Sequence, residues 1–571
     1  MSYLDLMSNF SISTLQKILG NEIIENLNEW NYSQEDKWSK KKLVSMIDCL
    51  YGINILKKSC VREQLLLSMR KNDVISLAQK YFSNNSEFDL RKVCKVLSEK
   101  QWGNNSLSLE LLRSWEIENN IFENSNKTET STVSKIISSE RFFELLDYQF
   151  FIKQRVLNIL NSDLPLGKVL VYMPTGTGKT KTAMHIITNY LGFTLHKKGL
   201  VIWVAHTTEL LEQAYSTFCS VWKHLGDGEI NVYRFWSNAE LDCEEPFNGI
   251  MFCGLGKLMS VAKGNKKLYS RLIEDCRLFV FDEAHKAAAT ETKKIIADFM
   301  RKTSEMKNRF LLGLTATPGR TSDYSDENQN FSLMFENRIV SIDSDVINYM
   351  NFGKQVSENL SLEKNIISYF QKRKILSKMQ KEELCYEQNF SKEELAVLKS
   401  GFDSNESKDF TNRQLEIFAR NKSRNQAILT GLRKMYLLKK PTIVFACSVL
   451  HAKMLSAILT LEDIPNCVVT GDMNSFDRKK AIDSFKDRNN PCNIIINFEV
   501  LTTGFDSTNI QCVFITRPTK SIVLYSQMLG RGLRGPLMGG QEECLLIDVK
   551  DNLESFDNEK AFSYFDSYWN K

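Results

Sequence analysis

A glycine-rich turn between an apolar run and a helical segment is the first feature of this sequence whose residues could do chemistry. The apolar run ends at Tyr172, and Met-Pro-Thr-Gly-Thr-Gly-Lys-Thr follows at 173–180. Gly176 and Gly178 let backbone N–H groups converge on a phosphate without a Cβ in the way, and the N-terminus of the next helix adds its positive dipole end. The sequence therefore predicts a phosphate-binding loop here.

Two side chains at the end of this loop complete its chemistry. Lys179 is placed to bridge the β- and γ-phosphates of a nucleoside triphosphate, and the Thr180 hydroxyl is placed to bind Mg²⁺. The full P-loop pattern has glycine where this chain has Met173, so a simple turn is the alternative at this point. The residues expected to bind the nucleotide are Thr175, Gly176, Thr177, Gly178, Lys179 and Thr180.

A second pair of candidate residues follows another apolar run. The run 278–281 is followed directly by Asp282, Glu283 and, two residues later, His285. A carboxylate at the C-terminal tip of a strand beside a phosphate loop is where Mg²⁺ is held. We expect Asp282 to hold the metal ion, and Glu283 to orient and deprotonate the attacking water. For His285 a packed core histidine is the alternative to a role in the site.

Length and composition exclude several classes of protein. The chain has 571 residues, more than one hydrophobic core sustains, and its formal net charge is +5, far from that of a polycation. The 13 cysteines form no C-x-x-C pair and the six histidines no H-E-x-x-H motif, so we expect reduced thiols, no zinc site and a cytoplasmic protein. There is no N-terminal signal and no apolar stretch of ~20 residues, so we expect no membrane partner.

The distribution of proline predicts how the chain is organised. None of the nine prolines lies in 1–164 or between 319 and 440, which favours helices there, and a polar run at 118–132 is typical of a linker. Buried apolar runs that alternate with helical periodicity predict parallel sheets. These predicted strands lie at 169–172, 200–204, 278–281 and 310–314, and again at 442–445, 467–469, 493–496, 512–515 and 544–547.

The fold class expected is therefore α/β, with two parallel-sheet lobes in tandem. An all-α N-terminal domain precedes them, and a helical insertion separates them. The expected boundaries are 1–135 for the helical domain, 136–345 for lobe 1, 346–430 for the helical connector, 431–555 for lobe 2 and 556–571 for a C-terminal tail.

Further motifs occur in the order found in helicase superfamily 2, which the sequence therefore resembles. They are Tyr148-Gln149, Ala205–Gln213 (motif Ia), Leu314–Arg320 (motif III), Val444–Ser448 (motif IV), Leu501–Asp506 (motif V) and Gln527–Arg534 (motif VI). The resemblance covers about 140–550 and is to the DEAD/DEAH type. In motif style it is closest to the motor (ResIII-like) subunits of type I and type III restriction enzymes. It implies that both lobes are RecA-like and that the cofactors are ATP and Mg²⁺.

The resemblance also implies roles for residues outside the phosphate loop. Gln149 resembles the residue that recognises adenine, and Gly504 and Asp506 also belong to the expected nucleotide site. Thr315 and Thr317, with His285, are expected to couple hydrolysis to domain movement.

Motif VI supplies the expected catalytic residues of lobe 2, which are Gln527, Arg531 and Arg534. The two arginines are three residues apart, which predicts that they share one helix face and point at the γ-phosphate across the lobe interface.

Nucleic-acid contacts are expected mostly to phosphates, from residues in loops or at helix starts where backbone N–H groups are free. The residues expected to make them are Thr207, Gly256, Ser448, Gly471 and Thr502. For each of them an ordinary capping or turn role is the alternative.

The function expected is that of an ATP-dependent DNA translocase or helicase that powers a defence (restriction-like) or DNA-repair assembly. Residues 1–135 would dock the DNA, or a nuclease or other subunit, and the DNA would be duplex. The motif style supports DNA, and the assembly role rests on the resemblance alone. An RNA helicase and an ATP-gated scaffold protein are the alternatives. Asp548-Val-Lys550 resembles the end of a nuclease motif, but we assign it to a strand of the second sheet.

Overall fold

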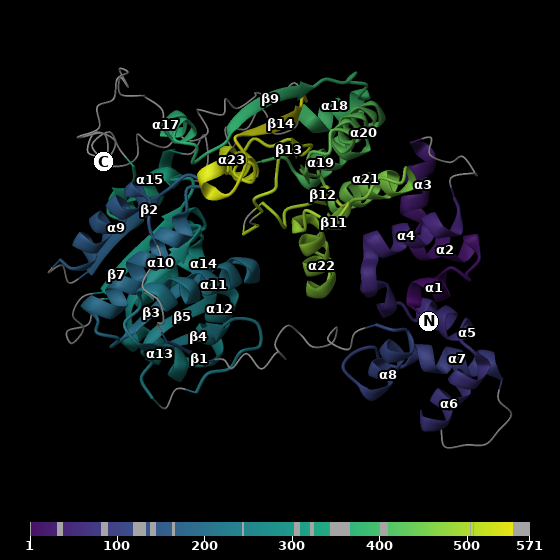
Figure 1. Cartoon of the computed structure of the whole chain (residues 1–571), viewed down its shortest axis with the longest axis horizontal. Coiled ribbons are helices and arrows are strands. Elements are labelled where there is room, and N and C mark those ends of the chain that lie inside the picture. The colour runs from purple at the N-terminus through teal and green to yellow at the C-terminus, as the bar shows by residue number, and fades with distance from the viewer. Residues whose placement is uncertain are drawn as a thin grey trace.

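The computed structural model describes residues 2–30, 38–81, 89–117, 133–137, 144–162, 166–242, 245–301, 309–319, 325–342, 366–399, 409–502, 504–505 and 507–551. Figure 1 shows three units, which in sequence order are a helical block, a lobe built on an eight-stranded sheet, and a lobe built on a six-stranded sheet. We call them the helical block (described residues 2–117), lobe 1 and lobe 2.

The helical block contains only helices in its described residues. Apolar side chains recur at helical spacing, and side-chain caps such as Ser11, Ser39 and Asn105 accept the first free backbone N–H groups. The helices are α1 (Tyr3–Met7), α2 (Ile12–Leu19), α3 (Asn21–Glu29), α4 (Lys40–Tyr51), the 3₁₀-helix η2 (Gly52–Lys57), α5 (Ser59–Leu67), α6 (Lys71–Tyr81), α7 (Leu90–Glu99) and α8 (Ser106–Ser114). The expected all-α start of the chain is confirmed.

Lobe 1 has a sheet in the order β1-β4-β5-β3-β6-β7-β2-β8, parallel except for the antiparallel pair β1 and β4. The strands are β1 (Val133–Ile137), β2 (Leu166–Tyr172), β3 (Leu200–Ala205), β4 (Glu229–Phe235), β5 (Gly249–Gly254), β6 (Cys276–Asp282), β7 (Arg309–Thr315) and β8 (Ile339–Val340). The helices are α9 (Asp147–Leu160), α10 (Lys179–Asn189), the π-helix η4 (Tyr190–Thr194), α11 (Thr208–Leu225), α12 (Leu255–Gly264), α13 (Lys266–Asp275), the 3₁₀-helix η5 (Ala284–Ala288), α14 (Thr290–Phe299) and α15 (Ser325–Met334). Strands β2 and β6, which precede the two candidate motifs, are separated in the sheet only by β7.

Lobe 2 has a sheet in the order β11-β12-β10-β13-β14-β9, and all of its neighbouring strands are parallel. The strands are β9 (Lys378–Leu384), β10 (Thr442–Phe445), β11 (Cys467–Val469), β12 (Ile494–Asn497), β13 (Cys512–Ile515) and β14 (Glu543–Val549). The helices are α18 (Lys392–Lys399), α19 (Asn412–Arg420), α20 (Lys422–Leu437), α21 (Val449–Leu461), α22 (Ser475–Lys486), α23 (Ile522–Leu529) and the 3₁₀-helix η6 (Pro536–Met538). The two predicted tandem sheets are confirmed, and Asp548 lies on β14 as assigned.

The range 346–430, expected to be a helical connector, is not wholly helical. Its described part begins with α17 (Ile366–Lys372), and β9 then joins lobe 2 as the edge strand beside β14. Strand β9 is rich in Lys and Glu and mostly exposed. Since an edge strand of this kind has no buried face, no apolar pattern in the sequence indicates it.

The helical block packs on lobe 2, although lobe 1 follows it in the sequence (Figure 1). Apolar side chains of α4 and α21 belong to one continuous core. Lys42 donates to the carbonyl of Leu461 at 2.6 Å and pairs with Asp463 at 2.9 Å. Because buried apolar area is shared, the block and the core of lobe 2 form a single packed body.

Two further expectations concern cysteine and the membrane. Cys467 on β11 and Cys492 before β12 lie next to each other, with 6.7 Å between their Cα atoms. The two cysteines are 25 residues apart, so no C-x-x-C spacing in the sequence signals that they are neighbours. Among the described residues, no helix combines the length and the apolar character that a membrane crossing requires.

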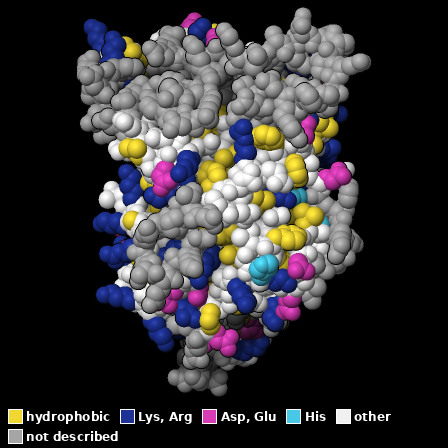
Figure 2. Space-filling view, turned by 90° about the vertical axis from the view of Figure 1, so that its left-hand side faces the viewer, with side chains coloured by type: hydrophobic (Ala, Val, Ile, Leu, Met, Phe, Trp, Pro, Cys, Tyr) yellow, Lys and Arg dark blue, Asp and Glu magenta, His cyan; other side chains and the backbone are white. Residues whose placement is uncertain are grey.

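The outer face of lobe 1 is mixed in character. Lys and Arg side chains gather along one margin of it, and apolar side chains lie scattered among polar ones (Figure 2). Phe150 and Phe193, both in lobe 1, are more than half exposed. Scattered apolar side chains of this kind are ordinary for a protein surface.

Candidate nucleotide site between the lobes

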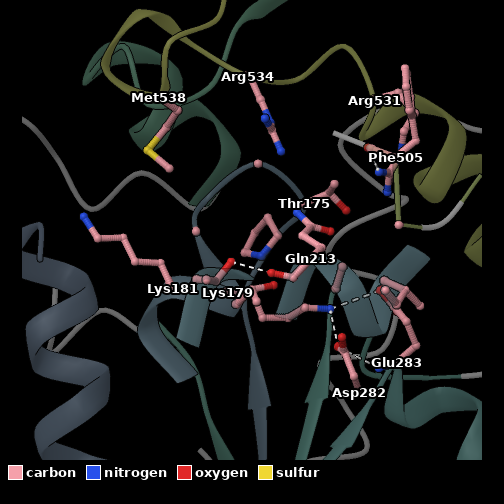
Figure 3. A pocket seen from close by; sticks show the side chains of 18 residues that line it. Thr175, Lys179, Lys181, Gln213, Asp282, Glu283, Phe505, Arg531, Arg534 and Met538 are labelled. Atoms are coloured by element: carbon pink, nitrogen blue, oxygen red, sulfur yellow. Dashed lines mark hydrogen bonds and ion pairs between the residues drawn. The ribbon is translucent and has the colours of Figure 1, made fainter. Parts of the chain in front are cut away.

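A cavity of about 290 Å³ lies where the two lobes meet, and both contribute to its walls (Figure 3). Lobe 1 provides the glycine-rich turn, the start of α10, one face of α11 and the end of β6. Lobe 2 provides residues after β12 and after α23. The lining residues are Pro174, Thr175, Gly176, Gly178, Lys179, Thr180, Lys181, Leu210, Gln213, Thr217, Asp282, Glu283, Ala316, Gly504, Phe505, Arg531, Arg534 and Met538.

The glycine-rich turn has the backbone that its sequence predicts. Gly176 and Gly178 have φ of +87° and +82°, a region that side chains rarely adopt, and Gly178 directly precedes α10. A Cβ on Gly178 would lie 2.3 Å from Nε2 of Gln149, and one on Gly176 would lie 3.2 Å from Leu376. Both glycines are therefore required by close packing as well as by the turn. Thr177 closes the turn through its hydroxyl, which donates to the carbonyl of Pro174 at 2.7 Å.

Lys179 is the centre of a buried charged cluster at the floor of the cavity. Its ammonium lies 3.1 Å from Oε1 of Glu283 and 3.5 Å from Oδ1 of Asp282 (Figure 3). The two carboxylates follow β6, and Glu283 has a left-handed φ of +53° that turns its side chain toward the lysine. This strain at a non-glycine residue occurs where the sequence places the attacking-water carboxylate.

The pKa values of the cluster follow from burial and pairing. Burial alone lowers the pKa of Lys179, but the two carboxylates outweigh it and raise that pKa. Burial raises the pKa of Glu283, yet Lys179, His285 and Arg531 lower it to about 2. For Asp282 burial prevails and its pKa is raised. Glu283 is therefore ionised, because it makes the shorter contact with Lys179 and faces more positive groups.

The residues present fit a magnesium nucleotide. Oε2 of Glu283 is buried and accepts no hydrogen bond within the described residues, and Asp282 and Thr180 line the same cavity. No cluster of three or more His, Cys, Asp or Glu side chains that could hold a metal alone occurs in the described chain. Mg²⁺ usually binds through one or two protein groups and substrate phosphates, so Asp282 and Thr180 are the residues that would hold it. When bound, the ion would neutralise charge on the phosphates.

The motif VI arginines approach the cavity from lobe 2. Nη1 of Arg531 donates to the carbonyl of Phe505, and Nε donates to the carbonyl of Gln527 at 3.3 Å. Burial lowers the pKa of Arg531 and of Arg534 to about 10, so both stay charged at neutral pH. Helix α23 ends at Leu529, so the prediction that the arginines share a helix face is wrong.

The reason for that difference is close packing between the lobes. Gly530 and Gly532 follow the helix, and a Cβ on Gly530 would lie 2.5 Å from Thr175 of the phosphate loop. After Gly530 the chain forms a turn, in which the N–H of Arg531 bonds to the carbonyl of Met528 at 3.2 Å, and both arginines line the nucleotide pocket.

One hydrogen-bonded chain joins the three residues expected to couple hydrolysis to movement with Gln527, which was expected to be catalytic. Nε2 of Gln527 lies 3.2 Å from Nε2 of His285, whose Nδ1 lies 3.3 Å from the hydroxyl of Thr315. That hydroxyl donates to the carbonyl of Thr317 at 2.6 Å. Burial lowers the pKa of His285 to about 4, so its ring is neutral. The structure thus brings the side chains of Gln527, His285 and Thr315 and the backbone carbonyl of Thr317 together across the lobe boundary.

Gln149 is not placed as the expected adenine-recognising residue. It is 1% exposed, and its Nε2 donates to the carbonyl of Thr177 at 3.0 Å and lies 3.3 Å from the hydroxyl of Tyr148. Its Oε1 accepts the N–H of Leu146 at 3.0 Å. In this structure the Gln149 amide therefore holds the phosphate loop through the carbonyl of Thr177.

The remaining expected residues are dispersed. Gly504 lines the cavity and packs on Leu210, and Asp506 lies outside the described residues. Of the five nucleic-acid candidates, Thr207 caps α11, Ser448 caps α21 and Thr502 is buried. Gly256 in α12 and Gly471 after β11 have open space where a Cβ would be.

Sequence reasoning missed several cavity-lining residues. Gln213 and Thr217 lie one turn apart on α11, and a helical wheel of motif Ia could have placed them together. Phe505 stands within motif V. Met538 lies beyond motif VI in η6, and no signal in the sequence marks it.

Family models match both lobes. Residues 142–320 match the family described as "Type III restriction enzyme, res subunit", and residues 424–535 match the "Helicase conserved C-terminal domain". The chain belongs to helicase superfamily 2. The first match contains the phosphate loop and the Asp282–Glu283 pair, and the second contains motifs IV to VI, so this superfamily 2 helicase has a ResIII-like motor.

Several named proteins are similar to this helicase. IRC3 of Saccharomyces cerevisiae, named as an ATP-dependent helicase, is 26% identical over 67% of this chain and 48% of its own length. The irc3 protein of Schizosaccharomyces pombe, named as mitochondrial, is 25% identical over 68% of this chain and 54% of its own. MPH1 of Scheffersomyces stipitis, named as an ATP-dependent DNA helicase, is 28% identical over 38% of this chain and 19% of its own. This chain spans about half the length of the first two.

Among solved structures, Saccharomyces cerevisiae Dbp5 bound to RNA and ADP–BeF₃ is similar at 15% identity. The match covers 73% of this chain and 87% of that chain, with a TM-score of 0.45.

Proposed function

We propose that this helicase is an ATP-driven motor that moves on duplex DNA. The observation that carries the proposal is the single cavity lined by Lys179 and Glu283 of lobe 1 and by Arg531 and Arg534 of lobe 2. A complete set of phosphate-binding and hydrolytic groups split between two lobes allows hydrolysis only when the lobes are closed. Each ATP hydrolysed would then open and close the lobes once.

The roles proposed within the cavity follow its geometry. Lys179 exchanges its carboxylate partners for phosphate oxygens, Glu283 takes the proton of the attacking water, and the two arginines stabilise the charge that develops on the γ-phosphate. A change in the pocket is transmitted to the lobe boundary by the hydrogen-bonded chain of Gln527, His285, Thr315 and Thr317.

Two features support DNA as the nucleic acid. The motor domain matches the res subunit of type III restriction enzymes, and the relative MPH1 is named as an ATP-dependent DNA helicase. The proposed phosphate contacts are Thr207, Gly256, Ser448, Gly471 and Thr502. Thr207 and Ser448 stand at the N-termini of α11 and α21, where free backbone N–H groups favour an anion.

The helical block lies beside two of these proposed phosphate contacts, Ser448 and Gly471. Ser448 lines a cavity of about 250 Å³ together with Glu22 and Asn26 of α3. Nδ2 of Asn54 donates at 3.2 Å to the carbonyl of Asp472, the residue after Gly471. We therefore propose that residues 1–135 contact the DNA or dock a second subunit, such as the nuclease of a defence or repair assembly in the cytoplasm.

ATPase assays test the proposal directly. We expect duplex DNA to stimulate ATP hydrolysis by the full chain more than single-stranded DNA or structured RNA does. Lys179→Ala and Glu283→Gln should abolish the stimulated rate, while Lys153→Ala on α9 serves as a lysine control outside the cavity.

Displacement of a triplex-forming strand, without separation of a forked duplex, would identify translocation. ATP hydrolysis rates that are equal with and without each polynucleotide would overturn the proposal that the protein is a motor. Stimulation by RNA alone would overturn DNA as the substrate.

A further inference from the structure

The segment between the lobes is anchored first on lobe 1. Phe370 of α17 is fully buried and packs edge-on against Tyr148, with 4.9 Å between ring centroids. The hydroxyl of Tyr148 donates to the carbonyl of Thr177 in the phosphate loop at 2.7 Å. Arg373 pairs with Asp147 at the start of α9 at 2.8 Å. This part of the connector therefore supports the same side of the phosphate loop that Gln149 supports.

The next residues pair with the arginine loop of lobe 2. The chain turns at Lys374, which has a left-handed φ of +56°. The N–H of Gly535 then donates to the carbonyl of Ile375, and the N–H of Ser377 donates to the carbonyl of Leu533, both at 2.9 Å. Leu376 and Arg534 form an antiparallel bridge between these two bonds. The backbone of Arg534 is thus held by the connector as a strand is held by its neighbour.

The buried hydroxyl of Ser377 also holds the loop that carries Arg534. Ser377 is fully buried, and its Oγ is within hydrogen-bond distance of the carbonyl oxygens of Arg534 and Gln541, the latter at 2.6 Å. Strand β9 begins at the next residue and joins β14. Ser377 therefore ties the arginine loop to the edge of the lobe 2 sheet.

Leu376 connects this pairing to the phosphate loop. The position of a Cβ on Gly176 lies 3.2 Å from Cδ2 of Leu376, 3.5 Å from the carbonyl of Leu533 and 3.6 Å from Cγ of Arg534. The connector and the arginine loop thus meet the phosphate loop at one point. A displacement of Leu376 would displace Arg534 and press on Gly176 because the interior there is closely packed.

We propose that residues 370–377 act as a positioning element that seats Arg534 over the phosphate loop, with Ser377 as its positioning residue. This inference rests on the proposed function, since it assigns Arg534 to ATP hydrolysis. Phe370 and Arg373 hold the element to lobe 1, and Ser377 holds it to lobe 2. The backbone turn at Lys374 lies between the two anchors, and its carbonyl accepts the N–H of Leu537 of lobe 2 at 3.1 Å.

The test is a kinetic comparison of Ser377→Ala with the wild-type full chain under DNA stimulation. Loss of the hydroxyl frees the arginine loop, so we expect kcat to fall about 10- to 100-fold, as for a displaced catalytic group, with KM for ATP unchanged. Ser391→Ala, an exposed serine of lobe 2, is the matched control and should keep the wild-type kcat. A Ser377→Ala kcat equal to that of the wild type would overturn the proposal.

A double mutant separates positioning from general damage to the fold. If Ser377 acts through Arg534, Ser377→Ala should add no further loss of kcat in an Arg534→Gln background. A loss that multiplies in full would overturn the proposal, because Ser377 would then act by another route. If Ser377→Ala does not fold, Arg373→Gln at the other anchor replaces it. We expect Arg373→Gln to lower kcat in the wild-type background and to add no further loss in the Arg534→Gln background.

The proposed function and this inference fail differently. A wild-type chain that hydrolyses no ATP with any polynucleotide overturns the proposed function. A wild-type chain that hydrolyses ATP, together with a fully active Ser377→Ala variant, overturns only the role of the connector.

Discussion

Nε2 of Gln527 lies 3.2 Å from Nε2 of His285, across the boundary between the lobes. The Thr315 hydroxyl already donates to the carbonyl of Thr317, so Nδ1 of His285 must donate to Thr315. In a neutral imidazole Nε2 is then the acceptor, and the Gln527 amide donates to it. The chain of donors thus runs in one direction, from lobe 2 through His285 to the loop after β7.

This directionality predicts the effect of Gln527→Glu. A carboxylate has nearly the shape of the amide but cannot donate to His285, so the chain is interrupted at the lobe boundary. We expect the DNA-stimulated kcat to fall about fivefold, the equivalent of one hydrogen bond of about 1 kcal/mol, and to fall by a larger factor than the unstimulated rate. Gln426→Glu, exposed on α20, is the control. An equal fall in both rates would contradict a coupling role.

The Lys179 cluster predicts that two inactivating substitutions differ in stability. Lys179→Ala leaves Asp282 and Glu283 buried beside each other without the ammonium that contacts both, which costs about 3 kcal/mol. Glu283→Gln leaves Lys179 paired with Asp282, so we expect a smaller loss. Thermal denaturation followed by calorimetry should show a lower first transition for Lys179→Ala.

The difference should also shrink at acidic pH, because protonation relieves the unpaired carboxylates. Glu283 has a pKa of about 2 in the wild type, and removal of Lys179 must raise it. A difference in Tm that is independent of pH would show that the repulsion does not account for it.

Gln149 supports a prediction about base specificity. Its Nε2 contacts Thr177 and Tyr148, and its buried Oε1 is bonded to Leu146. We expect Gln149→Ala to raise KM for ATP and for GTP by the same factor, because the substitution loosens the phosphate loop and removes no contact with the base. Steady-state kinetics with both nucleotides measure this, with Gln154→Ala on the exposed face of α9 as control. A selective loss with ATP would restore Gln149 as the adenine-recognising residue.

The sequence predicted the central strands and the chemistry at their ends well. Strands such as β3 and β6 are buried on both faces, so their apolar runs are continuous and bounded by turn residues. Lys179, Asp282 and Glu283 were found because a phosphate loop and a carboxylate pair need fixed residue types at strand ends. These local rules hold regardless of what packs around them.

Long-range packing lay beyond the sequence. Strand β9 is exposed and charged, so nothing in its pattern distinguishes it from a helix or loop. The apolar face of α4 predicts a helix but not that α21 covers it. Gln149 packs against Gly178, and Gly530 at the end of α23 packs against Thr175, and only the folded chain brings these residues near each other.

The contact between η2 and α22 predicts a sensitive glycine. Gly52 has a φ of +50°, and a Cβ there would lie 2.4 Å from Cγ of Asp477. Asp477 cannot easily move, because its carboxylate accepts the N–H of Ile53 at 3.0 Å and the amide of Asn474 at 2.8 Å. We expect Gly52→Ala to lower stability by about 2 kcal/mol and to loosen the helical block from lobe 2.

Hydrogen exchange should locate that change as faster exchange in η2 and at the start of α22. Gly103→Ala, in the same block with open space at its Cβ, is the matched control. Unchanged exchange at both elements in Gly52→Ala would mean that the interface does not depend on this contact.

His451 predicts how stability depends on pH. Its Nδ1 accepts the N–H of Cys447 at 3.1 Å, and its Nε2 donates to Oδ1 of Asn425 at 3.0 Å. The ring therefore has no free nitrogen to protonate, and burial, with Arg424 nearby, lowers its pKa from 6.5 to about 3. Below pH 6.5 His451 binds a proton in the unfolded chain but stays neutral in the folded chain. The contribution of His451 is thus fully present above pH 6.5 and is lost as the pH falls toward 3.

Between pH 6.5 and 5 this loss amounts to about 2 kcal/mol, at about 1.4 kcal/mol for each pH unit. Urea denaturation of the wild type and of His451→Gln at both pH values measures it. The variant should be less stable at pH 7, because Gln cannot match both contacts of the ring, but its stability should fall less on acidification. His196→Gln, at an exposed position, should keep the wild-type pH dependence. If His451→Gln also keeps it, the acid sensitivity belongs to other buried groups, such as His185, whose pKa burial lowers to about 3.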